Sequence, residues 1–310
     1  MKRKKRFHLP STGIISKKKF EYRYRGEFGF ELPLIIPHAY YRAKYGKPYS
    51  TVGCGNMAPF YFFSPNHSDD LECKRETKGN QVAMMSMTKC RNQFIQTCML
   101  KEEWESPPFS EYYKGCSSSF TRSIHPYVVV NNKYSKEKLV NKSTGRAKFG
   151  AFNHFDVDVL GTIFNLFVNN GYSVVYNQPD WNYVEHEGQN VETKWKIKQE
   201  ENVRDLIKGY SHVYAVADLA RDSEIEYNLL QLHILSLAQV QVSVQGGIGI
   251  LASLWGQTNF ILRRRGREVL TGLNNMSYYE NVYTRISGSS LIVCSDQEEL
   301  LMKVARYLKL

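Results

Sequence analysis

Residues 239–256 constrain the fold of this chain more than any other segment. The segment begins with β-branched residues at alternate positions, Val240, Val242 and Val244, a pattern typical of a β-strand. Three glycines follow, and then a run of small and apolar residues that predicts a buried helix ending at Gly256. The sequence therefore predicts a strand, a glycine turn and a helix in direct succession.

The three glycines of this turn are Gly246, Gly247 and Gly249. Glycine lets a backbone approach a ligand closely, and free backbone N–H groups at the start of a helix attract phosphate. An ordinary strand-to-helix turn without a ligand explains the same residues. The rest of the chain has to decide between these two interpretations.

Size and composition predict a globular protein of two domains. The chain has 310 residues, which is long for a single core but suits two domains of about 150 residues. Its net charge is +11, with basic residues concentrated in residues 1–18, which we expect to form a solvated tail. Contact of this tail with anionic lipid or nucleic acid is the alternative.

We expect a cytoplasmic protein. The basic start is not followed by the apolar run of a signal peptide, and no stretch of about 18 apolar residues predicts a membrane-spanning helix. The six cysteines are scattered and form no CxxC pair, so we expect free thiols in a reducing compartment.

Strand and helix patterns alternate in both halves of the chain. Residues 20–25 predict a strand, residues 26–29 a turn and residues 31–45 a helix that Pro37 kinks. A capping-box pattern at residues 223–226 predicts a helix start. Further strands are expected at residues 58–64, 127–130, 172–176, 213–216 and 260–262, a turn at 64–70, and further helices at 92–101, 158–168, 201–208 and from 295 onward.

This alternation predicts an α/β fold with parallel sheets covered by helices. We expect two Rossmann-like domains facing a central cleft. The expected divisions are a basic tail (1–18), an N-terminal domain (19–124), a C-terminal domain (125–294) and a terminal helix (295–310).

Five blocks of sequence carry a resemblance to a known family: residues 26–31, 36–40, 61–65, 129–134 and 243–247. They resemble glycosyltransferases of the GT-B type found in bacterial and giant-virus glycan synthesis. The resemblance to fucosyltransferases and exostosin-like enzymes is loose, and the tyrosine- and lysine-rich composition is similar to that of algal-virus xylosyltransferases.

The resemblance implies a nucleotide-sugar donor held by the C-terminal domain and a glycan acceptor held by the N-terminal one. It also implies that no metal or cofactor is required, and that the terminal helix crosses back to the first domain. We favour a UDP-sugar such as UDP-xylose as donor, with GDP-fucose as the alternative. We expect transfer with inversion, because no arrangement for a covalent sugar intermediate is evident.

Transfer without a metal needs backbone N–H groups and a cation to stabilise the leaving diphosphate. Lys133 follows the strand at 127–130, and ligands in open α/β sheets bind at the carboxyl ends of strands. A solvent-exposed loop lysine is the alternative for Lys133. The residues assigned to donor binding are Lys133, Glu226, Asn228, Ser243, Gln245, Gly246, Gly247, Ile248, Gly249 and Glu268.

Glu226 has an alternative role as a helix cap, and Glu268 as an exposed loop acid. A base must also deprotonate the acceptor hydroxyl. Glu27, in a glycine-flanked turn, is the first candidate, followed by Glu31, His38 and His67.

Two rival interpretations remain. Asp156 and Asp158 form a DxD pattern, which the metal-dependent GT-A glycosyltransferases use to bind a divalent ion, but Asp158 also suits the start of a helix. The high positive charge also fits a non-catalytic nucleic-acid-binding protein, although we expect no nucleic-acid partner because the charge concentrates in the tail.

Overall fold

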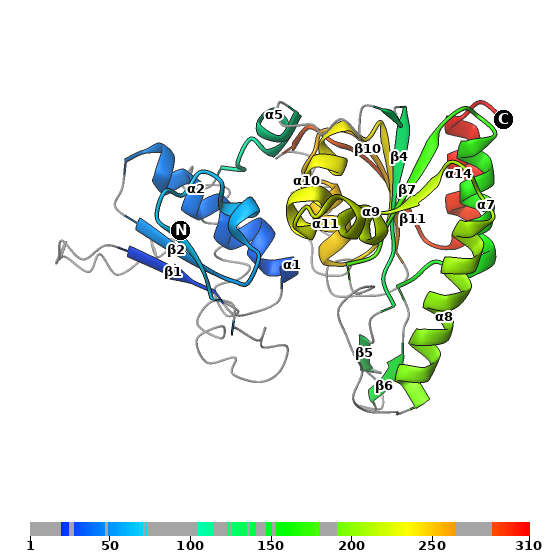
Figure 1. The fold of residues 1–310 in the computed structure, drawn as a ribbon, viewed down its shortest axis with the longest axis horizontal. Coiled ribbons are helices and arrows are strands. Elements are labelled where there is room, and N and C mark those ends of the chain that lie inside the picture. Colours follow the sequence, from blue (N-terminus) through cyan, green and yellow to red (C-terminus); the bar gives the residue numbers. More distant parts are fainter. Residues whose placement is uncertain are drawn as a thin grey trace, which may run out of the picture.

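Figure 1 shows the chain as a computed structural model. It describes residues 20–24, 28–46, 49–70, 72, 105–114, 123–124, 126–134, 137–140, 147–150, 153–179, 191–263 and 287–310. The basic tail, the predicted helix at 92–101, and the candidates Glu27 and Glu268 lie outside these residues.

A six-stranded sheet forms the centre of the second half of the chain, and its neighbouring strands all pair in parallel. Its order is β11-β10-β9-β4-β7-β8. The two central strands, β4 and β9, are buried along their whole length, as expected for a parallel sheet with both faces covered. The strands are β4 (Tyr127–Asn131), β7 (Ser173–Asn177), β8 (Val213–Ala215), β9 (Val240–Val244), β10 (Thr258–Leu262) and β11 (Ser290–Cys294).

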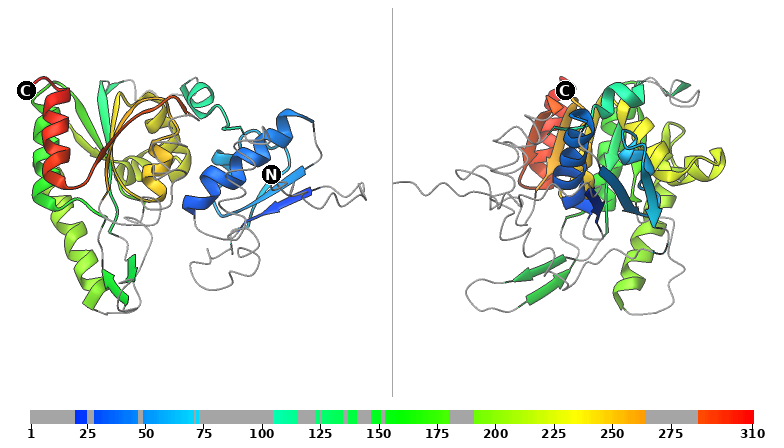
Figure 2. Two further views of the ribbon diagram at one scale, coloured as in Figure 1. Left: turned by 180° about the vertical axis from the view of Figure 1, so that it is seen from behind. Right: turned by 90° about the vertical axis from the view of Figure 1, so that its left-hand side faces the viewer.

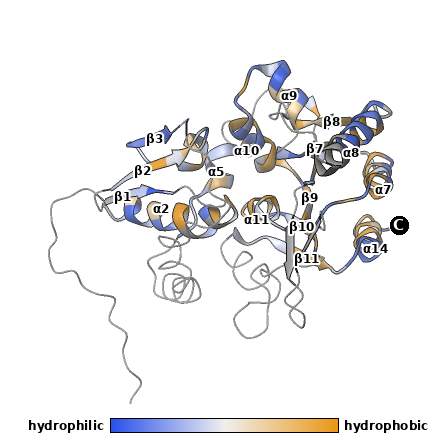
Figure 3. Cartoon of the chain, turned by 90° about the horizontal axis from the view of Figure 1, so that it is seen from below, coloured by the Kyte–Doolittle hydropathy of each residue, from blue (hydrophilic) through white to orange (hydrophobic). Residues whose placement is uncertain are grey.

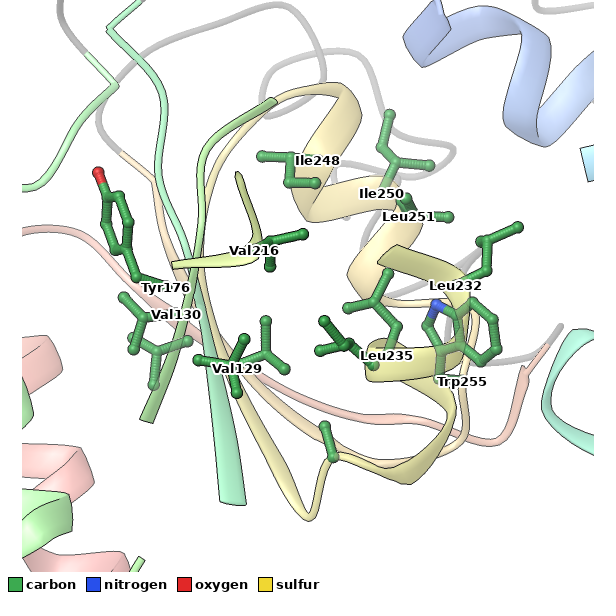
Figure 4. Close-up of a cluster of buried hydrophobic side chains, with 14 of the residues drawn as sticks. Val129, Val130, Tyr176, Val216, Leu232, Leu235, Ile248, Ile250, Leu251 and Trp255 are labelled. Carbon is green, nitrogen blue, oxygen red and sulfur yellow. The ribbon is translucent and has the colours of Figure 1, made fainter. Parts of the chain in front are cut away.

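Helices cover both faces of this sheet (Figures 1 and 2). One face carries α7 (Val157–Val168), α8 (Val191–Lys208) and α14 (Gln297–Tyr307). The other carries α9 (Val216–Ser223), α10 (Tyr227–Leu237) and α11 (Gly247–Ala252). On this second face Val129 of β4 lies near Leu235 of α10, with Leu251 and Trp255 close by (Figure 4).

The first half of the chain contains a smaller parallel sheet of order β1-β2-β3. Its strands are β1 (Phe20–Arg23), β2 (Tyr49–Cys54) and β3 (His67–Asp70). The helical segments are α1 (Phe28–Phe30), the π-helix η1 (Glu31–Ile35), α2 (Ile36–Lys44), the 3-10 helix η2 (Ala58–Tyr61) and α5 (Phe109–Lys114). A hairpin of β5 (Glu137–Val140) and β6 (Ala147–Gly150) follows β4.

The expected fold class, α/β with a parallel sheet in each half, is confirmed. Figure 3 shows the smaller sheet on the side of the larger one that α10 and α11 cover. The domain boundary near residue 124 stays a prediction. The terminal helix α14 packs on α7, β10 and β11, so it remains with the second sheet and does not cross back.

The helix expected over residues 31–45 begins earlier than predicted, at Phe28, and is irregular at its start. Pro37 has no N–H to donate to a carbonyl one turn earlier, so an ordinary α-helical turn cannot close there. The π-helix over Glu31–Ile35 comes directly before Pro37, and Pro37 itself lies in the first turn of the regular α-helix that follows. The irregular turn therefore precedes Pro37, and the kink at Pro37 stays a prediction.

Several predicted elements are wrong in type or extent. The apolar run at 58–64 is a 3-10 turn with Pro59 in its first turn, because proline lacks the donor that a central strand needs. Part of the expected turn at 64–70 is strand β3, and β2 and β11 were not predicted. Helix α8 begins at Val191, ten residues before the expected start at Glu201.

The predicted capping box at 223–226 is also corrected. Ser223 ends α9, and its hydroxyl donates to the carbonyl of Leu219 at 2.6 Å. Glu224 then adopts a left-handed conformation (φ 56°), so the chain turns before Glu226 starts α10.

Cysteine chemistry also differs from expectation at one position. Cys54, at the end of β2, is disulfide-bonded, so the prediction of free thiols is wrong for this residue. Cys294 is a buried free thiol, and burial raises its pKa to about 11. Among the described residues, no helix is both long and apolar enough to cross a membrane.

Helix α5 joins the two halves through aromatic side chains. The Tyr113 hydroxyl donates to the carbonyl of Pro59 in the first half, at 2.5 Å. On the other side, the ring centroid of Phe109 lies 5.8 Å from that of Trp255. Aromatic rings bury a large apolar area and pack in defined geometries, so α5 fixes the distance between the halves at this point.

We expect the attachment of α14 to depend on its buried face. Leu300 is fully buried, whereas Met302 on the same helix is 54% exposed. Leu300→Ala should lower the free energy of unfolding by about 2–5 kcal/mol, through lost burial and the cavity left behind. Met302→Ala, the matched control, should change it by less than about 0.5 kcal/mol. Denaturant unfolding measures both, and equal effects would contradict the packing described.

Candidate functional site

The predicted glycine turn joins β9 to α11. Gly246 occupies the N-cap position of α11 with φ 124° and ψ −165°, a backbone conformation open almost only to glycine. The strand before it is fully buried, and the N–H of Gln245 donates to the carbonyl of Leu262 on β10, at 3.0 Å. The predicted order of strand, glycine turn and helix is confirmed, with the helix ending at Ala252.

Lys133 meets this turn. Strands β4 and β9 are parallel neighbours, with Asn131 paired to Ser243, so the carboxyl ends of both strands lie at the same edge of the sheet. A Cβ atom placed on Gly246 would lie only 2.5 Å from the Lys133 ammonium nitrogen. The expectation that Lys133 and Gly246 lie close together at the carboxyl ends of two strands is confirmed.

The first half of the chain reaches the same turn. A Cβ atom on Gly247 would lie 3.3 Å from the backbone nitrogen of Gly29 and 3.4 Å from the ring of Phe28. Helix α1, which contains Phe28 and Gly29, is in contact with α11. Two glycine-containing motifs far apart in the sequence therefore pack backbone against backbone.

Ser243, Gln245, Ile248 and Gly249, also assigned to donor binding, are all buried. The Ser243 hydroxyl donates to Asn259 Oδ1 at 2.9 Å and accepts from Asn131 Nδ2 at 3.1 Å. Its side chain is therefore part of the interior of the sheet. The backbone at Gly246 and Gly247 is the part of the motif that contacts both Lys133 and the first half of the chain.

Glu226 is the N-cap residue of α10, the alternative that the sequence left open. One carboxylate oxygen accepts from the N–H of Asn228 at 2.9 Å, and the other from the N–H of Leu229 at 2.8 Å. The side-chain amide of Asn228 donates to the carbonyl of Asn56 in the first half, at 2.6 Å. Asn56 has a positive φ of 62°. These residues form a second contact between the halves.

Two candidate bases belong to one cluster inside the first half. Glu31 is fully buried and accepts a hydrogen bond from the Tyr61 hydroxyl at 2.8 Å. The ring of His67 stacks on that of Tyr61, with centroids 4.7 Å apart. His67 is also held on both sides, by Thr51 Oγ1 at 2.8 Å and by Asp69 Oδ1 at 2.9 Å. The cluster ties η1, η2 and β3 together.

The second histidine candidate has a packing role. His38, on α2, lies with its Nδ1 atom 2.8 Å from the Tyr22 hydroxyl of β1, and the two rings meet edge to face. It joins helix α2 to strand β1.

Asp156 and Asp158 lie at the start of α7. Asp156 is the N-cap residue, and its Oδ2 atom accepts from Gln297 of α14 at 2.5 Å while Oδ1 lies 3.1 Å from His154. Asp158 is in the first turn, where the negative charge of an acidic side chain interacts favourably with the helix dipole. Within the described ranges, no group of three or more His, Cys, Asp and Glu side chains is placed to hold a metal ion.

The sequence interpretation missed Gly29, Phe28 and Asn56 as residues at the contact between the halves. A signal for Gly29 was present, because it belongs to one of the two glycine-rich motifs. Asn56 follows a strand that was not predicted, so no signal singled it out.

Comparison with known proteins identifies no family. No family model matches the chain, and no curated protein matches it. Among solved structures, E. coli heptosyltransferase WaaC with ADP is similar at 12% identity and a TM-score of 0.38, over 88% of this chain and 70% of that one. UDP-GlcNAc 2-epimerase from Neisseria meningitidis bound to UDP-GlcNAc is similar at 11% identity and a TM-score of 0.35, over 86% and 63%. UDP-GlcNAc 2-epimerase from Methanocaldococcus jannaschii is similar at 14% identity and a TM-score of 0.33, over 86% of this chain and 64% of that one.

Replacement of Gly246 tests the geometry of the turn. Gly246→Ala should lower the free energy of unfolding by roughly 1–3 kcal/mol, because alanine is strained at φ 124° and its Cβ displaces the Lys133 ammonium. Gly171→Ala is the control, since Gly171 also has a positive φ (81°) but has nothing within 4 Å of the added Cβ.

Adding Lys133→Met should recover part of the Gly246→Ala loss by removing the displaced charge. Denaturant unfolding of the wild-type protein and the three variants measures this. A Gly246→Ala cost equal to that of Gly171→Ala, without recovery by the second substitution, would contradict the contact.

Proposed function

We propose that this protein is a nucleotide-sugar glycosyltransferase that binds the donor diphosphate at Lys133 and the turn at Gly246 and Gly247. The observation that carries the proposal is the position of the Lys133 ammonium against the backbone of Gly246, at the carboxyl edge of two parallel strands. A flexible cation and a closely approachable backbone are the groups that stabilise a phosphate anion.

The contact with the first half supports a transfer reaction. Phe28 and Gly29 lie against Gly247, so a donor at the turn would face the first half of the chain. An acceptor held by that half would then be next to the donor, as transfer requires. Many kinds of protein bind a diphosphate, and the resemblance of the sequence blocks to GT-B glycosyltransferases is the reason for proposing sugar transfer.

The proposal includes roles that rest on the sequence. Glu27 directly precedes Phe28 and stays the proposed base for the acceptor hydroxyl. Glu268 stays a proposed contact of the donor sugar or ribose. A UDP-sugar such as UDP-xylose is the proposed donor, with transfer by inversion and without a metal, and the acceptor is a glycan hydroxyl.

Nucleotide affinity tests the role of Lys133. A charged hydrogen bond to phosphate contributes about 1.5–3 kcal/mol, so Lys133→Ala should weaken UDP binding by roughly 10- to 100-fold. The loss should be smaller for UMP, which lacks the second phosphate. Lys208→Ala, at an exposed lysine on α8, should leave both affinities unchanged. Isothermal titration with UDP and UMP measures these values.

A thermal-shift panel with UDP, GDP and ADP comes before the titration. No stabilisation of the wild-type protein by any of the three at millimolar concentration would refute the proposed function. If Lys133→Ala weakens the affinity for UDP and for UMP equally, the second phosphate does not bind at Lys133.

A further inference from the structure

A line of buried polar side chains crosses the apolar interior of the larger sheet. Four neighbouring strands contribute to it: Asn177 from β7, Asn131 from β4, Ser243 from β9 and Asn259 from β10, all with no exposed surface. Valine flanks Ser243 on both sides, and Val130 and Phe260 adjoin Asn131 and Asn259. Buried polar groups are costly unless each finds a partner, so this line requires an explanation beyond packing.

The line starts at α10. The hydroxyl of Tyr227, the first residue of that helix, donates to Asn177 Oδ1 at 2.6 Å. Asn177 Nδ2 donates to Asn131 Oδ1 at 2.8 Å, and Asn131 Nδ2 donates to Ser243 Oγ at 3.1 Å. Each group therefore accepts from the previous strand and donates to the next.

The line ends at α11. Ser243 Oγ donates to Asn259 Oδ1 at 2.9 Å, and Asn259 Nδ2 donates to Ser253 Oγ at 3.2 Å. Ser253 Oγ donates to the carbonyl of Gly249 inside α11, at 2.7 Å. Every donor points in the same direction from Tyr227 to Gly249, and hydrogen bonds in such a chain polarise and strengthen one another.

The two ends of this chain lie at α10 and α11, which both contact the first half of the protein. Next to Tyr227, Asn228 donates to the carbonyl of Asn56. Near Gly249, Gly247 packs on Gly29. The middle of the chain is also close to the proposed cation, because Asn131 precedes Lys133 by two residues. The chain thus connects both contacts and the glycine turn.

We propose that Tyr227 is a positioning residue for the glycine turn and acts through this hydrogen-bonded chain, although it lies on a different helix. Tyr227, Asn177, Asn131, Ser243, Asn259 and Ser253 together fix where α11 sits relative to α10. The effect on nucleotide binding rests on the proposed function, whereas the mechanical link between the two helices does not.

Amide hydrogen exchange tests the link without a ligand. In α11 the N–H of Ile250 donates to the carbonyl of Gly246 and the N–H of Ser253 to that of Gly249. Tyr227→Phe removes one hydroxyl at the far end of the chain and should speed exchange at these two amides by about three- to tenfold. Ser243→Ala, which breaks the chain in the middle, should have the same effect.

Tyr127→Phe is the matched control. The Tyr127 hydroxyl is also buried and donates to the carbonyl of Ile234 in the same helix α10, at 2.6 Å, but Tyr127 is not part of the chain. It should leave exchange in α11 unchanged. Unchanged exchange in Tyr227→Phe, or equal acceleration in Tyr127→Phe, would overturn the proposal.

The affinity for UDP then tests the positioning role. Tyr227→Phe should weaken UDP binding by about three- to tenfold, and Tyr127→Phe should not. Faster exchange in α11 with unchanged UDP affinity would refute the positioning role. If the wild-type protein binds no nucleotide, the proposed function fails, and the exchange result still decides whether the two helices are linked.

Discussion

The parallel pairing of β4 with β9 is the constraint on which the candidate site depends. It places the ends of two strands that are more than 100 residues apart in the sequence at one edge of the sheet. Lys133 and Gly246 each lie two residues beyond the end of their strand, so the pairing alone brings them together. In an antiparallel pair, the carboxyl ends of the two strands would lie at opposite ends, so the same residues would be about one strand length apart. Because Gly246 has no side chain, the Lys133 side chain occupies the space that a Cβ atom would take.

The same pairing connects the site to the interior of the sheet. Asn131 and Ser243 are register partners and hydrogen-bond through their side chains. A sheet filled only with apolar residues would hold its helices by shape, and apolar contacts have little directional preference. Directed hydrogen bonds fix the position of a helix more narrowly, provided that every group is satisfied. Here the polar line runs from α10 to α11, and both helices touch the first half of the protein.

Much of the larger sheet was predictable from the sequence. The runs that became β4 and β9 are rich in valine, and the glycines after β9 require a turn, so both signals are local. Lys133 could be named because strand ends in parallel sheets meet at one edge. The smaller sheet was less predictable, since its short strands carry mixed polar residues such as His67–Asp70 and are identified only by their neighbours. The roles of Glu226 and Glu31 depended on which N–H or hydroxyl lies opposite them, which the sequence alone does not contain.

The central claim is that a diphosphate binds where Lys133 meets the glycine turn. The most direct test is a crystal structure of the protein with UDP. We predict phosphate oxygens within hydrogen-bonding distance of the Lys133 ammonium and of the backbone N–H groups at Gly246 or Gly247, on the side that faces Phe28 and Gly29. UDP bound with its phosphates at another edge of the sheet, away from both Lys133 and the turn, would contradict the account.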